Sequence, residues 1–100
     1  MIRGTTPTFE LTVEDTVDLT EASNVYATFR ARNKTLTKTG EDLNITAHQV
    51  DVYFNQEESL SFLSGFIEVQ LNWTYSNGSR ACSNVVKISV GDNLLPEVLV

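Results

Sequence analysis

The fold is decided by one nine-residue stretch, Ile67-Glu68-Val69-Gln70-Leu71-Asn72-Trp73-Thr74-Tyr75. Its apolar residues stand at every second position, and polar residues fill the positions between them. Side chains alternate between the two faces of a strand, so this pattern predicts a long strand with one face buried. We interpret it as a core strand with Trp73 and Tyr75 on its inward face, and the remaining strands are predicted around it.

The next residues, Ser76-Asn77-Gly78-Ser79, predict a hairpin turn, because Asn-Gly is the strongest short signal for a tight turn between antiparallel strands. The returning strand begins with Ala81, Ser83 and Val85 on one face. It continues with Val86, Ile88 and Val90, so its phase slips at Val85 and Val86. Such a slip indicates a β-bulge or a strand that passes from one sheet to another.

Shorter strands are predicted upstream by the same alternation. They are centred on Phe9 to Val13, Val25 to Ala31, Lys34 to Lys38, Ile45, and Val50 to Phe54. With the long hairpin, this makes about seven strands at the spacing typical of a sandwich. We therefore expect an all-β protein, an immunoglobulin-like antiparallel β-sandwich without the cysteine pair of antibody domains.

One short helix interrupts the strands, at about residues 56–63. Asn55 is a good N-cap, and Glu57 and Glu58 follow it, where acids favour the positive end of the helix dipole. Leu60, Phe62 and Leu63 are its expected buried side chains, and Gly65 its expected C-terminal glycine.

The connection at 14–24 is acidic and is expected to contain a short extended piece at Val17 and Leu19. The chain divides into an N-terminal arm (1–8), a sandwich domain (9–90) and an apolar C-terminal arm (91–100). The arms are expected to be extended.

Composition excludes several classes of protein. The chain has 100 residues, enough for one domain, and its net charge of −6 argues against binding to nucleic acid or to an anionic membrane surface. Its apolar runs are too short to span a bilayer. Residues 1–5 do not resemble a secretory signal, so we expect synthesis in a cytoplasm.

No catalytic or metal-binding pattern is present, and we expect neither an enzyme nor a cofactor. His48 has no companion nucleophile pattern, and the acidic groups at 14–18 and 41–42 lack the spacing of a calcium loop. Cys82, the single cysteine, cannot form an internal disulfide and is expected to be a small buried or half-buried side chain.

Docking to other proteins is the function that the remaining features favour. Arg30, Arg32 and Lys34 are expected on one face of an extended segment, either as a charged edge that prevents aggregation or as a surface for an acidic partner. The apolar C-terminal arm would dock as well, matched by the N-terminal arm. The candidate partner-docking residues are Ile2, Arg3, Pro7, Arg30, Arg32, Lys34, Leu94, Leu95, Val98 and Leu99.

The chain also resembles a known group of proteins. The octapeptide at residues 1–8 is similar to the start of small proteins, of about 100 residues, encoded among virion genes of phages and prophages of Gram-positive gut bacteria. The similarity returns at residues 55–60, 81–84, 90–91 and 95–99. The entry at Asp18-Leu19-Thr20 and the hairpin at 76–79 resemble the N-terminal β-sandwich domain of upper baseplate proteins of lactococcal phages.

The resemblance implies a virion structural protein, a homo-oligomeric adaptor or decoration subunit that docks to capsid, neck, head-fibre or baseplate proteins. It would be made in the cytoplasm of the bacterial host and carried in the virion. The alternative is a stand-alone β-sandwich module that binds a host-surface glycan or protein. Exposed aromatic residues on loops would favour the alternative, whereas apolar arms favour the structural role.

Overall fold

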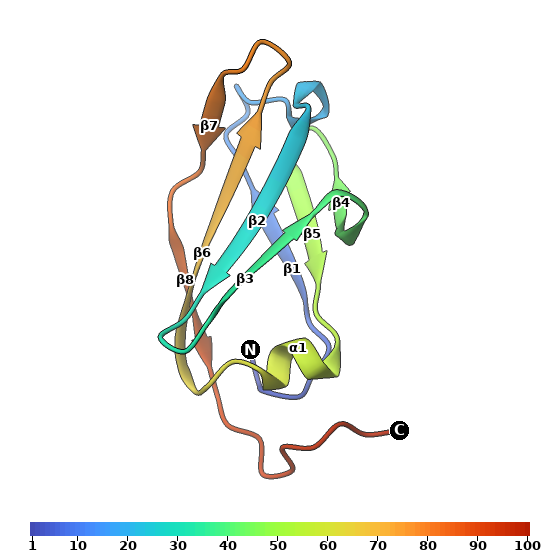
Figure 1. Ribbon diagram of the computed structural model, residues 1–100, viewed down its shortest axis with the longest axis vertical. Helices are drawn as coiled ribbons and strands as arrows, with labels where there is room; N and C mark the ends of the chain where they lie inside the picture. The colour runs from blue at the N-terminus through green and yellow to red at the C-terminus, as the bar shows by residue number, and fades with distance from the viewer.

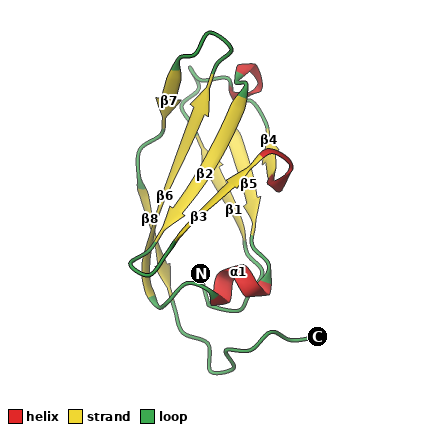
Figure 2. Ribbon diagram, in the orientation of Figure 1, coloured by secondary structure: helices red, strands yellow, loops and turns green.

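The computed structural model describes residues 1–100 as an elongated two-layer sandwich of 47 × 26 × 21 Å (Figure 1). Figure 2 shows that strands dominate and that a short α-helix lies at one end; the other red segments are the 3₁₀ turns Leu19–Glu21 and Gly40–Asp42. The strands are β1 (Thr8–Thr12), β2 (Asn24–Arg30), β3 (Thr35–Thr39), β4 (Leu43–Ile45), β5 (Gln49–Tyr53), β6 (Gly65–Thr74), β7 (Arg80–Cys82) and β8 (Val86–Val90). The helix, α1, spans Gln56–Leu60, which is far shorter than a membrane-spanning helix.

The strands form two antiparallel sheets. One has the order β1-β5-β4, and the other has the order β3-β2-β6-β7, with β8 also paired to β6. An immunoglobulin sandwich places its second, fifth and fourth strands in one sheet and its third, sixth and seventh in the other. This chain has that arrangement without the first strand, so that β1 corresponds to the second strand and β2 to the third, and with β3 added at the edge beside β2. The predicted fold class is confirmed.

β6 is the central strand of the larger sheet, as its alternation predicts. It pairs with β2 from Glu68 to Thr74 on one side and with β7 and β8 on the other. Its inward side chains Ile67, Val69, Leu71 and Trp73 are each 3% exposed or less. The Trp73 Nε1–H donates to the hydroxyl of Tyr75 at 3.0 Å, so the indole is buried with its polar atom satisfied.

The phase slip is a β-bulge, and it divides the last strand into β7 and β8. Asn72 of β6 pairs with Cys82 of β7, and Glu68 of β6 pairs with Lys87 of β8. Four steps along β6 therefore match five along the returning strand, which holds one extra residue. Ser83 covers the gap, since its amide donates to the Leu71 carbonyl and its hydroxyl accepts from the Leu71 amide, both at 2.9 Å. Both halves stay in the same sheet. Because the last strand is divided, the structure has eight strands where about seven were predicted.

Four phenylalanines join the two sheets and the helix. Phe9 of β1 lies 5.5 Å from Phe29 of β2 and 5.2 Å from Phe54, between ring centroids. Phe54 in turn lies 4.7 Å from Phe29 and 5.9 Å from Phe62, which follows α1. These rings form the core at the end of the sandwich that carries the helix.

The helix is shorter than expected and ends differently. Asn55 and Glu58 form a capping box, each side chain accepting from the other's backbone amide at 2.9 Å. Phe62 is buried as predicted, but Leu63 is 54% exposed. The helix ends at Leu60, and Gly65 opens β6 with a φ of 130° instead of closing the helix.

The acidic connection also differs from its prediction. Leu19 is buried, but it lies in a 3₁₀ turn, Leu19–Glu21, and not in an extended piece. Asp18 begins this turn, and its carboxylate accepts from the Thr20 amide at 3.0 Å. A polar residue that satisfies the first amide of a turn favours the turn over a strand.

Replacing Trp73 by Ala should lower the free energy of unfolding by about 3–5 kcal/mol, because it leaves a large cavity behind a strand paired on both sides. That loss is comparable to the whole stability of a small domain. Phe66→Ala on the outward face of the same strand is the control, with an expected change within about 0.5 kcal/mol. Thermal and urea unfolding would measure both, and a Trp73→Ala protein with unchanged stability would contradict the inward placement.

Candidate functional site

The N-terminal segment lies against its own domain. Ile2 forms a parallel bridge with Gly91, in which the Arg3 amide donates to the Gly91 carbonyl at 3.0 Å and the Gly91 amide donates to the Met1 carbonyl at 2.8 Å. The Met1 ammonium donates to the Ser89 carbonyl at 2.7 Å. A Cβ on Gly91 would stand 2.8 Å from Ile2 Cδ1, the end of a side chain that is 48% exposed, so a larger residue at position 91 would displace the Ile2 side chain.

The side chains of this segment are also used inside the subunit. The Arg3 guanidinium donates to the carbonyls of Phe62 at 2.7 Å and Leu60 at 2.9 Å, and the Pro7 carbonyl accepts from the Phe54 amide at 3.0 Å. Arg3 and Pro7, two of the predicted docking residues, thus make contacts at the end of α1 and the start of β1. Unpaired backbone carbonyls after a helix are good acceptors for an arginine.

The three basic candidates do not share one face of an extended segment. β2 ends at Arg30, and the Ala31 amide donates to the Lys34 carbonyl at 2.8 Å, so Arg32 stands in a turn. Arg30 pairs with Glu68 of β6 at 3.0 Å. Lys34 donates to Ser61 Oγ at 3.0 Å and lies 5.5 Å from the ring centroid of Phe62. The chain reverses direction at this point, which separates side chains that alternation alone would align.

Lys38, the neighbouring cation in sequence, is buried. Its ammonium contacts a carboxylate oxygen of Glu58 at 2.5 Å and donates to the Tyr53 carbonyl at 3.0 Å. Partial burial alone would raise the pKa of Glu58. Hydrogen bonds from Lys38 and from the Asn55 amide, with the charges of Lys38 and Lys34, outweigh it and hold the pKa below its ordinary 4.5. The pair ties α1 to β3.

A basic hollow lies on the outer face of the larger sheet, beside the turn between β2 and β3. Its volume is 590 Å³, and Arg30, Arg32 and Lys87 supply its cations. Leu63 and Phe66 supply apolar surface and are 54% and 66% exposed. Glu68 is its single acid, standing in register between Arg30 on β2 and Lys87 on β8.

Two cations of this hollow have no partner inside the molecule. Among the seven lysines and arginines, the side chains of Arg32 and Lys87 alone form neither a salt bridge nor a hydrogen bond. Both line the basic hollow. A region with a positive surplus, in a chain of net charge −6, is complementary to an acidic partner.

Sequence reasoning found Arg30 and Arg32 but missed the rest of the hollow. The bulge determines which way Lys87 points. If the register of β7 continued without the bulge, Lys87 would lie opposite the inward Ile67; with the bulge, it pairs with the outward Glu68. The alternation of β6 does assign Phe66 to the outward face with Glu68. The missing signal was the size of the register shift.

The C-terminal segment, residues 91–100, leaves the sandwich and passes beneath α1 (Figure 1). It is held by Asn93, whose side chain donates to the Arg3 carbonyl at 2.9 Å, and by two hydrogen bonds between Leu99 and the Gln56 side chain. Its five large apolar side chains are each at least 48% exposed: Leu94, Leu95, Val98, Leu99 and Val100.

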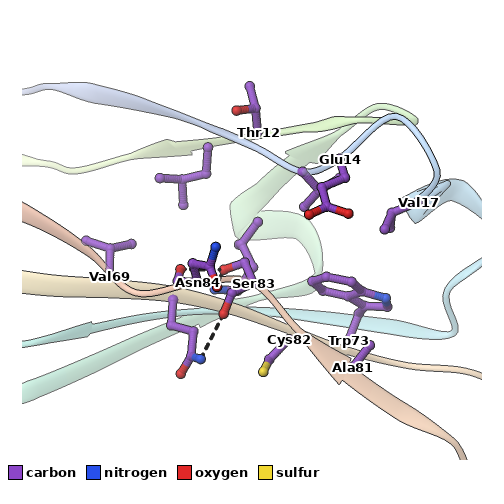
Figure 3. A pocket seen from close by; sticks show the side chains of 13 residues that line it. Thr12, Glu14, Val17, Val69, Trp73, Ala81, Cys82, Ser83 and Asn84 are labelled. Atoms are coloured by element: carbon purple, nitrogen blue, oxygen red, sulfur yellow. Dashed lines mark hydrogen bonds between the residues drawn. The ribbon is translucent and has the colours of Figure 1, made fainter.

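A second hollow, of 340 Å³, opens between β1 and the bulge (Figure 3). Its floor is the inward face of β6, where Val69, Leu71 and Trp73 are at most 3% exposed. Gln70 donates to the Ser83 carbonyl at its rim at 2.9 Å. The hollow is therefore lined largely by residues of the core, at the position of the bulge.

The remaining reactive side chains do not gather. His48 is exposed, and its Nδ1 lies 2.6 Å from the Val17 carbonyl. Cys82 is exposed, which corrects the expectation of a buried or half-buried thiol, because it pairs with Asn72 on the outward face of β6. No three His, Cys, Asp or Glu side chains come together as metal ligands would.

Comparisons with protein-family models, curated proteins and solved structures gave no match.

Removing the charge of Glu58 should weaken the tie between α1 and β3. Since the pKa of Glu58 is lower in the folded than in the unfolded protein, its stabilisation is complete above the unfolded value and is lost as the pH falls through the folded value. Glu58→Gln, which can keep the capping box, should cost about 1–3 kcal/mol at pH 7 and flatten the loss of stability below pH ~4.5. Urea unfolding from pH 7 to pH 3 measures this, and parallel curves for wild type and variant would contradict it.

Proposed function

We propose that this protein is a structural subunit of a phage virion, a small β-sandwich that assembles in several copies and docks to capsid, neck, fibre or baseplate proteins. It would be made in the cytoplasm of the bacterial host and retained in the particle. The resemblance of residues 1–8 and 95–99 to small virion-gene proteins supports this role.

The exposed apolar C-terminal segment is the observation that carries the proposal. Soluble domains bury most large apolar side chains, and a contiguous exposed group marks an interaction site. Here five of them lie within residues 94–100, outside the sandwich, and each is at least 48% exposed although the segment passes beneath α1.

The energy available from this segment is sufficient for docking. Full burial of an exposed Leu or Val side chain contributes roughly 1.5–3 kcal/mol, and Leu95, Val98 and Leu99, already about half covered, gain about half of that. The cost of ordering the segment is subtracted from this gain. Pro96 reduces that cost, because it limits the conformations of the free segment. The surplus from five side chains would hold a small subunit on a particle.

Deleting residues 94–100 should leave a folded domain that is no longer incorporated into particles. The deletion keeps Gly91 and Asn93, which bond to Met1 and Arg3, and loses only the Leu99–Gln56 hydrogen bonds that tie the segment to the sandwich. Circular dichroism would follow folding, and mass spectrometry of purified particles would follow incorporation.

A matched control separates chain length from apolar surface. A full-length variant with Leu94, Leu95, Val98 and Leu99 replaced by Ser should behave as the deletion does. Normal incorporation of both variants would contradict docking through this segment. A deletion variant that unfolds would show that the segment belongs to its own core, and would contradict the proposal equally.

A further inference from the structure

We infer that the basic hollow is the binding site for the C-terminal segment of a second copy of this chain. The inference rests on the proposed function in one respect, that residues 94–99 are the docking element. It adds the surface that receives them and the residues that recognise them.

The charges of the two surfaces are complementary. Residues 94–99 contain one acid, Glu97, and no cation, whereas Asp92, closer to the sandwich, lies 3.9 Å from the Arg3 guanidinium of its own molecule. The hollow contains Arg30, Arg32 and Lys87 against Glu68 alone, and Arg32 and Lys87 have no partner within their own molecule. Its cations are therefore available to a carboxylate from outside, and an acidic segment is the occupant that the hollow attracts.

The apolar parts match as well. The free segment bends at Leu94, Leu95 and Glu97; extended in the hollow of a second copy, it would point Leu95, Glu97 and Leu99 to the same side. This places a carboxylate between two leucines. The hollow has the corresponding arrangement, with the exposed Leu63 and Phe66 beside Arg32.

The segment of the same molecule is directed away from this hollow. Asn93 binds Arg3, and Leu99 binds Gln56 at the start of α1, so the segment runs beneath the helix. The hollow lies at the turn between β2 and β3 and on the outer face of the larger sheet (Figure 1). A segment from one copy entering the hollow of the next is a head-to-tail contact, which generates rings or filaments of many copies.

The test is the self-association of the purified full-length protein, followed by sedimentation velocity over a concentration series. Arg32→Glu should weaken association about five- to tenfold at low ionic strength, since it replaces an attraction by a repulsion at close range. Arg80→Glu is the matched control: it changes the net charge equally, from −6 to −8, at the opposite end of the larger sheet. Its association should stay within about twofold of wild type.

Variants of the segment test the same contact from the other side. Glu97→Arg changes the net charge from −6 to −4 and so reduces the general repulsion between copies, yet it should weaken association because it faces Arg32. The double variant Arg32→Glu/Glu97→Arg restores the net charge of −6 and the opposite signs, and should recover most of the affinity. Phe66→Ser, at an exposed position, should weaken association at every salt concentration.

A monomeric wild-type protein at all concentrations, an equal effect of Arg32→Glu and Arg80→Glu, or failure of the double variant to recover would each overturn the inference. The proposed function fails separately. Particles that contain the deletion variant at normal amounts would contradict docking to the virion while the association data stand. If self-association is unchanged in the Arg32→Glu and Glu97→Arg variants while deletion of residues 94–100 still abolishes incorporation, the inference is overturned and the proposed function stands.

Discussion

The contact between Phe9, Phe29, Phe54 and Phe62 is the interaction on which the rest of this structure depends. It joins both sheets and the end of α1, with ring geometries that add to the free energy of burial alone. With Phe62 fixed, the carbonyls of residues 60 and 62 are presented to Arg3, and the N-terminal segment is held in place. With Phe54 fixed, Lys38 lies over its ring and reaches Glu58. The contacts of Arg3 and of Lys38 at this end are therefore built around the aromatic core.

One extra residue at the bulge has consequences for the surface of the molecule. It lets Val90 remain buried while Lys87 faces outward beside Glu68, so the charged row Arg30, Glu68 and Lys87 crosses three adjacent strands. A strand without the bulge would place an apolar side chain in that row and a lysine toward the core. The backbone amide lost to the ladder is recovered through the Ser83 hydroxyl, which limits the cost of the insertion.

The two ends of the chain differ in their contacts with the sandwich. Residues 1–7 give their polar groups to the sandwich, through Gly91, Phe54 and the carbonyls after α1. Residues 94–100 make few such bonds and expose their apolar surface. The C-terminal segment therefore leaves the sandwich at Gly91, which is hydrogen-bonded to Met1 and Arg3.

Local sequence determined the strands, the long hairpin, the inward face of β6, the cap of α1 and the apolar character of the C-terminal segment. These follow from period-two alternation, the Asn-Gly turn and the capping residues, all of which act between neighbours in sequence. Tertiary structure decided which charged residues are free. Arg3, Lys34 and Lys38 make hydrogen bonds or salt bridges within the molecule. Arg32 and Lys87, 55 positions apart in the sequence, line the same hollow. The exposure of Cys82 and Leu63 was settled in the same way. The physical reason is that strand pairing, register and the direction of a turn are set by contacts between residues far apart in the chain, and no local pattern records the sum of those contacts.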